Sequence, residues 1–92
     1  MYYKGKPIIP TKRVLDELSN IGLDLTDVQR ILENGFEIRK RGKNVIEKGM
    51  GIGAKFVNVV VVDIGDYYKL IHAGKFTLTK KFKKLIGGKN GT

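Results

Sequence analysis

Three side chains in the sequence have the chemistry that acid–base catalysis on a phosphodiester would need: His72, Lys75 and Glu47. His72 is the single histidine of the chain, and an imidazole exchanges protons near neutral pH. An ammonium group at Lys75 would stabilise charge growing on phosphoryl oxygens, and Glu47 would act as a base from a neighbouring strand. The alternative for both His72 and Glu47 is a structural role, because no carboxylate stands at a defined spacing from the histidine.

The charge of the chain indicates a polyanionic partner, for which RNA is the candidate. The 92 residues include 18 Lys plus Arg and 9 Asp plus Glu, a net charge of +9. Residues 14–35 carry one cation against five acids, whereas residues 36–92 carry 13 cations against four acids. Clustered cations attract phosphates, although a lysine-rich surface also serves solubility alone. The residues expected to contact nucleic acid are Arg39, Lys40, Arg41, Lys55, Lys69, Lys80, Lys81 and Lys84.

Several classes of chemistry are excluded or unsupported. The absence of cysteine excludes disulfides and a thiolate nucleophile, and it fits a cytoplasmic location. No grouping of His, Asp and Glu has metal-ligand spacing, so we expect neither a metal nor a cofactor. The longest apolar run is Val59–Val62, far short of the ~20 residues of a membrane span, so no membrane contact is expected. Tyrosines that would either stack on bases or lie between core and surface are Tyr2, Tyr3, Tyr67 and Tyr68.

Two short helices are expected in the acidic part of the chain. The first begins after Thr11, a suitable N-cap, and ends at Gly22, which can adopt the left-handed conformation. The second begins near Asp24 and ends at Gly35. Its start carries two alternative capping pairs, Asp24 with Asp27 and Thr26 with Gln29. The short joint between the helices predicts a helical hairpin or corner.

Beyond Gly35 the pattern changes from helical to extended. Strands are predicted from Phe36, from Val45, over residues 55–64 and over residues 67–76, with a glycine-rich loop at 49–53. If the last strand is regular, Tyr68, Leu70 and His72 share one face. A final helix is expected over residues 77–86, with its lysines facing outward.

The order of these elements predicts an α+β fold with two N-terminal helices, a four-stranded antiparallel sheet and a C-terminal helix. Residues 1–92 form a single domain in this interpretation. Residues 1–10 are an extended lead-in, residues 11–86 are the folded core, and residues 87–92 are a flexible tail.

The stretch Leu23–Gly35 (LDLTDVQRILENG) and the element order that follows it resemble the RelE-like toxin superfamily, most closely the DUF4258 and BrnT-like groups. Residues 71–76, running into 79–81, occupy the place of the basic strand end and helix in BrnT proteins. The resemblance implies a RelE-like fold and an endoribonuclease toxin that an antitoxin protein neutralises. Chains of the DUF4258 group usually carry a histidine in the first helix, where this chain has Thr11, Lys12, Arg13 and Val14.

Two hypotheses therefore stay open. The first is a metal-independent endoribonuclease toxin of a toxin–antitoxin pair, with RNA bound on a basic surface of sheet and helix and His72 as a catalyst. The second is a non-catalytic module that binds nucleic acid or protein. The missing first-helix histidine and the lack of a clear base–acid pair favour the second.

Overall fold

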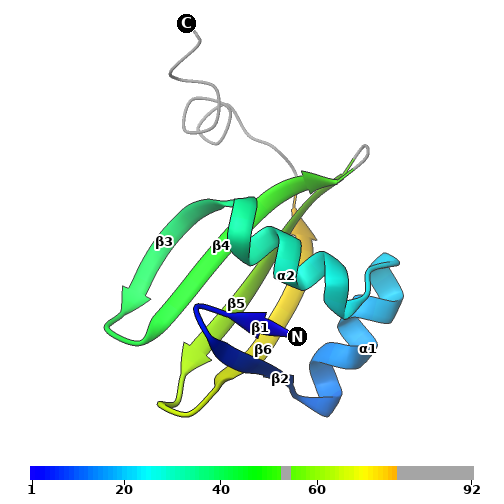
Figure 1. The fold of residues 1–92 in the computed structure, drawn as a ribbon. Coiled ribbons are helices and arrows are strands. Elements are labelled where there is room, and N and C mark those ends of the chain that lie inside the picture. The colour runs from blue at the N-terminus through cyan, green and yellow to red at the C-terminus, as the bar shows by residue number, and fades with distance from the viewer. Residues whose placement is uncertain (53–54, 77–92) are drawn as a thin grey trace, which may run out of the picture.

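The computed structural model of the protein describes residues 1–52 and 55–76, without the side chains of residues 39–41 and 76. The described residues form two helices and six strands. The elements in chain order are β1 (Tyr2–Tyr3), β2 (Lys6–Pro10), α1 (Lys12–Ile21), α2 (Leu25–Asn34), β3 (Phe36–Gly42), β4 (Val45–Ile52), β5 (Lys55–Asp63) and β6 (Tyr68–Phe76). Helix α2 crosses one face of the sheet, and α1 lies beside β6 (Figure 1).

The sheet is six-stranded and mixed, so the prediction of a four-stranded antiparallel sheet is wrong. Its strand order is β1-β2-β6-β5-β4-β3, and every neighbouring pair is antiparallel except β2 with β6, which is parallel. Residues 1–10, expected as an extended lead-in outside the folded core, supply the two additional strands. β2 was not predicted because its sequence contains two prolines. A strand nevertheless tolerates proline at its ends and on edges. The side chains of the paired residues Ile8 and Tyr68 are both buried. The helix predicted over residues 77–86 lies outside the described residues.

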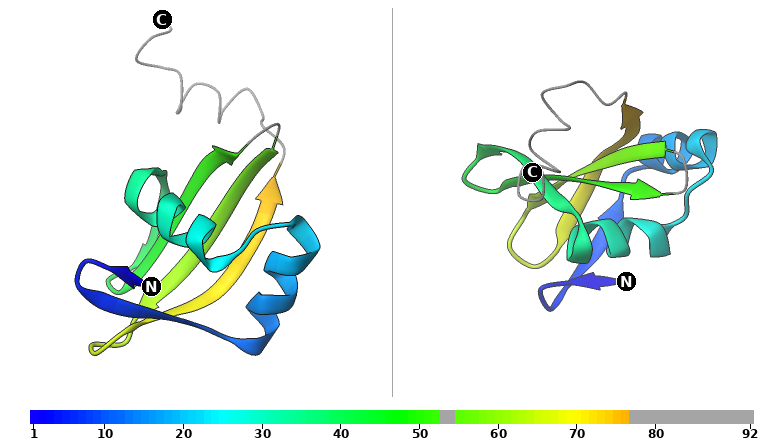
Figure 2. Two further views of the ribbon diagram at one scale, coloured as in Figure 1. Left: turned by 45° about the vertical axis from the view of Figure 1, so that its right-hand side comes forward. Right: turned by 90° about the horizontal axis from the view of Figure 1, so that it is seen from above.

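Helix α1 follows the local signals in its sequence. Thr11 is the N-cap, and its hydroxyl accepts a hydrogen bond from the Val14 amide at 3.2 Å. Gly22 closes the helix in the left-handed conformation with φ of 73°. The helix lies along the edge of β6 beyond the point where β2 ends, as Figure 2 shows. This position brings one side of α1 against the second half of β6.

Helix α2 begins with a reciprocal capping box. The Asp24 carboxylate accepts from the Asp27 amide, and the Asp27 carboxylate accepts from the Asp24 amide, each at 3.0 Å. This arrangement confirms the first of the two capping pairs expected from the sequence. The helix crosses the sheet over β4 and β5 (Figure 1).

The core lies between the helices and the inner face of the sheet, which we define as the face that Val57, Val59 and Val61 present to the helices. The outer face is the opposite one, and on β5 it carries Asn58 and Val60. The helical contribution to the core comes from Val14, Leu18, Ile21, Val28, Ile31 and Leu32, all buried. Burial of the valine-rich strand on both faces explains its nearly continuous apolar sequence.

The predicted loop at residues 49–53 is wrong over most of its length, because β4 continues to Ile52. A side chain at Gly49 would meet Cδ1 of Ile38 at 2.9 Å, so the glycine allows the edge strand β3 to approach β4 closely. Gly49 and Gly51 therefore lie inside a strand, where they make room for the side chains of Ile38 and Phe56.

Candidate functional site

A β-bulge in β6 decides which way His72 points. His72 is paired with Val60 and Leu70 with Val61, so Ile71 is an extra residue in this strand. Tyr68, Leu70 and Ala73 are buried, whereas the side chain of His72 is 47% exposed. The expectation that Tyr68, Leu70 and His72 share one face is therefore wrong, because the bulge interrupts the alternation of a regular strand.

Glu17 of α1 contacts the imidazole ring of His72. The Glu17 Oε1 atom accepts a hydrogen bond from the Ala73 amide at 3.0 Å and lies 3.3 Å from Nδ1 of His72. Arg13, one turn earlier in α1, places Nε 3.7 Å from the other oxygen of Glu17. The carboxylate is thus tied to the backbone of the same strand that carries the histidine. When Nδ1 carries the proton of the neutral ring, Nε2 is the nitrogen that accepts a proton.

The Nε2 atom of His72 faces the space above Gly74. A Cβ built at Gly74 would lie 3.1 Å from His72 Nε2 and 3.5 Å from the side-chain oxygen of Asn58. Asn58 in turn donates from Nδ2 to Glu47 Oε2 at 2.9 Å. The outer face therefore carries a row of polar groups in the order Glu17, His72, Asn58 and Glu47, and the missing side chain at Gly74 keeps the middle of the row open. We call this row the polar row.

The structure places two of the three predicted catalytic residues, Glu47 and His72, on the same face of the sheet and the third, Lys75, on the other. Glu47 and His72 both pair with Val60, one from each side, so their Cα atoms are separated by two strand spacings, about 10 Å. Glu47 is 7% exposed and accepts a hydrogen bond from Asn58, which lies between it and the histidine. Lys75 pairs with Val57 and so belongs to the inner face, on the opposite side of the sheet from His72.

The predicted nucleic-acid contacts are divided between described and undescribed parts of the chain. Lys69 pairs with Val62 on β6, and Lys55 pairs with Ile52 at the start of β5; both side chains are exposed. Residues 39–41 form the end of the edge strand β3, where Arg39 pairs with Glu47. The remaining three, Lys80, Lys81 and Lys84, lie outside the described residues.

The described side chains alone account for little of the positive charge. They include ten Lys or Arg and nine Asp or Glu, a net charge of +1. The rest of the +9 belongs to the basic run at residues 39–41 and to the five lysines after residue 76. A phosphate-binding surface that uses the excess charge must therefore involve the β3–β4 end of the sheet or the C-terminal residues.

Sequence reasoning missed Glu17, Asn58 and Gly74. Glu17 is 55 positions from His72, and no local pattern links the two. Gly74 did offer a signal, because a glycine inside a strand often marks a close approach of another group.

Within residues 1–52 and 55–76, no three His, Asp or Glu side chains are grouped so that they could hold a metal ion. The same residues contain no helix with the length and apolar character needed to cross a membrane. No protein-family model matches the chain, and no curated protein or solved structure matches it.

Proposed function

We propose that the protein binds RNA and cleaves it without a metal ion, with His72 as the general base. The observation that carries the proposal is the contact of Glu17 with His72, which fixes the ring so that Nε2 faces the space above Gly74. A base held in this way can take the proton of a ribose 2′-hydroxyl, and the resulting alkoxide attacks the adjacent phosphate. The net charge of the chain supports RNA as the substrate.

Glu17 is a positioning residue in this proposal. It stabilises the imidazolium that forms when His72 accepts a proton, as carboxylates do in other carboxylate–histidine pairs. Asn58 would accept a hydrogen bond from a ribose hydroxyl above Gly74, since its amide nitrogen is bound to Glu47 and its oxygen faces this space. A toxin role, an antitoxin partner and a cytoplasmic location are part of the same proposal, and they come from the sequence resemblance and composition.

A second candidate function is RNA binding without cleavage. The observation that favours it is the position of Lys75 on the inner face, which removes the cation expected to act beside His72. Cleavage requires stabilisation of charge on the phosphoryl oxygens as well as a base. Among the described residues of the outer face, Lys69 on the same strand is the cation available for that task.

The test is incubation of the purified full chain with a fluorescent single-stranded RNA in excess EDTA. We expect cleavage, a loss of about 100-fold or more in His72→Ala, and a loss of at least about tenfold in Glu17→Gln. Asp16→Asn is the matched control, because it removes the same charge from an exposed position of α1. Cleavage that survives in His72→Ala would overturn the catalytic role of the histidine.

Binding is measured separately to distinguish the two candidates. Salt-dependent RNA binding without cleavage in the wild-type chain would establish the second candidate and reject the first. Absence of both binding and cleavage at low salt would reject both.

A further inference from the structure

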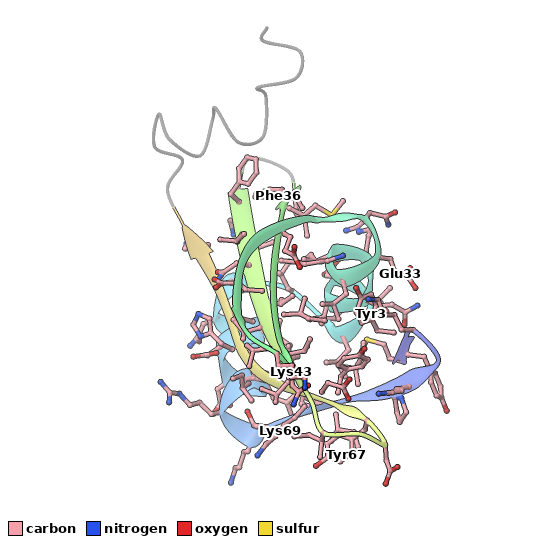
Figure 3. All side chains as sticks on the ribbon, turned by 90° about the vertical axis from the view of Figure 1, so that its left-hand side faces the viewer. Tyr3, Glu33, Phe36, Lys43, Tyr67 and Lys69 are labelled. Atoms are coloured by element: carbon pink, nitrogen blue, oxygen red, sulfur yellow. The ribbon has the colours of Figure 1, made fainter. Side chains whose placement is uncertain are left out.

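A polar cavity lies at the opposite end of the sheet from Gly74, between the β1–β2 hairpin and the β3–β4 turn. Its volume is about 260 Å³, just below the range of ~300–1,000 Å³ typical of pockets for drug-sized ligands. The residues that line it are Lys4, Glu37, Lys43, Asn44, Val45, Ile46, Asp63 and Tyr68. In Figure 3, which views the molecule from its β3 side, Lys43 lies above Tyr67 and Lys69, near the start of β6.

Two lysines, Lys4 and Lys43, belong to the lining of this cavity. The Lys4 ammonium lies 5.5 Å from the ring centroid of Tyr3. The Lys6 ammonium lies 5.3 Å from the ring centroid of Tyr68, which is itself part of the lining.

The two carboxylates of the lining do not cancel this charge. Lys6 binds Asp63 at 2.9 Å, and the Gly65 amide donates to the same oxygen at 2.9 Å, so Asp63 is already neutralised. Lys4 and Lys43 form no ion pair with any described side chain, and Glu37 alone opposes them. The net charge of the groups at the cavity is therefore positive.

Tyr68 provides a second, independent observation. The residue is only 4% exposed and lines the cavity, and its hydroxyl forms no hydrogen bond with any group that the structure describes. The hydroxyl oxygen is not among the buried, unpaired polar atoms of the described residues, so it is open to solvent. A bound anion would replace water as the acceptor of its hydrogen bond.

The backbone conformation at Lys4 is a further observation that supports a ligand site. Lys4 has a φ of 51° and precedes Gly5 with a φ of 81° in the two-residue turn of the β1–β2 hairpin. Asparagine or glycine is the usual residue at such a position, since a longer side chain is strained there. The lysine in this position reaches the cavity.

We propose that this cavity binds a phosphomonoester, held by Lys4, Lys43 and the hydroxyl of Tyr68. The size of the cavity suits one phosphate with part of the group that carries it. The phosphate would come from a free mononucleotide or from the 5′ end of an RNA, which share this chemistry. The proposal does not depend on RNA cleavage, because His72 belongs to the outer face and the cavity is lined by inner-face residues such as Ile46 and Tyr68.

Calorimetric titration at low salt tests the proposal, with inorganic phosphate, adenosine monophosphate and short RNAs with a 5′-phosphate or a 5′-hydroxyl as probes. We expect Tyr68→Phe and Lys43→Gln each to weaken binding of phosphate and the monophosphate by about five- to tenfold, the loss of one hydrogen bond or charge contact. Tyr68→Phe keeps the ring against Tyr3 and leaves no described group unpaired, so the variant should fold. Matched controls that leave the cavity intact are Tyr67→Phe and Lys12→Gln, the latter at an exposed position of α1.

The four probes identify the source of the phosphate. A 5′-phosphorylated RNA that binds more tightly than its 5′-hydroxyl counterpart supports an RNA end, and equal affinity of the two RNAs with binding of the monophosphate supports a free nucleotide. No binding of phosphate and monophosphate at millimolar concentration, or binding that Tyr68→Phe and Lys43→Gln leave unchanged, overturns the proposal. His72→Ala should retain phosphate binding, so failure of the cleavage proposal is distinguishable from failure of this one.

Discussion

Lys6 of β2 donates a 2.9 Å hydrogen bond to the carboxylate of Asp63 at the end of β5, although β6 lies between these two strands in the sheet. The bond crosses the start of β6, where the Lys6 ammonium also lies against the ring of Tyr68. It therefore ties the N-terminal hairpin to the centre of the sheet.

This ion pair predicts a specific pH dependence of stability. The hydrogen bond from Lys6 holds the pKa of Asp63 below its ordinary value, with a smaller effect from the Gly65 amide, and the same bond raises the pKa of Lys6. The stabilisation is complete above the unfolded Asp pKa of about 4 and is lost as the pH falls through the lowered folded value. At the alkaline end it is lost as the pH rises through the raised pKa of Lys6.

The measurement is thermal unfolding of the wild-type chain and Asp63→Asn from pH 2 to pH 7. We expect the wild type to be more stable at neutral pH and the two midpoints to converge below about pH 4. A constant difference down to pH 2 would show that the charge of Asp63 contributes nothing.

The bulge at Ile71 predicts that substitutions at the adjacent residues His72 and Ala73 have very different effects on stability. Ala73 is 2% exposed in the core, so Ala73→Leu should lower the free energy of unfolding by about 1–3 kcal/mol through overpacking. His72→Gln changes a half-exposed side chain and should cost less than about 1 kcal/mol. Urea denaturation of both variants checks the pair. The reverse ranking would mean that β6 is regular and that His72 faces the core.

The junction between α2 and β3 has no room for a side chain. A Cβ at Gly35 would lie against the carbonyl oxygen of Ile31 and 2.6 Å from that of Gly49. Because both atoms belong to the backbone, Gly35→Ala should destabilise the protein by about 1–3 kcal/mol. Gly42→Ala is the control, since a Cβ at Gly42 would have no atom within 4 Å and the φ of this residue is not positive. Equal stability of the two variants would contradict the close approach.

The turn at Lys4 predicts a conflict between stability and ligand binding. Lys4→Asn puts a residue that accepts positive φ in this place and should raise the free energy of unfolding by up to about 1 kcal/mol. The same variant removes one ammonium group from the cavity and should weaken phosphate binding. Denaturation and calorimetry on one preparation measure both effects, and a variant that is less stable than the wild type would argue against strain at Lys4.

Features that depend on neighbouring residues could be predicted from the sequence. Contacts between segments distant in the chain could not. Thr11, Gly22 and Asp24 indicate the helix ends because capping depends on residues within one turn. The parallel pairing of Ile8 with Tyr68 joins segments 60 positions apart, and no local pattern indicates it. The four later strands were predicted in their antiparallel order, whereas the sheet as a whole was not.

The same distinction holds for the residues of the candidate site. His72 and Glu47 were chosen for their side-chain chemistry and lie on the same face, but Glu17 was invisible because its contact with His72 requires α1 to pack against β6. Lys75 was placed beside His72 on sequence proximity, but the two are three positions apart in a regular part of β6 and therefore lie on opposite faces. The bulge at Ile71 changed the face of His72 relative to Tyr68 and Leu70, since strand faces alternate with a period of two.

The parallel pairing of β2 with β6 has a consequence for the synthesis of the protein on the ribosome. Residue 10 leaves the exit tunnel long before residue 70 is made, so Ile8 emerges without the strand against which it is later buried. Contacts between such distant segments form late and slowly. β1 and β2 are thus synthesised before β6 and are among the last strands to be secured, and during translation they are candidate binding sites for chaperones.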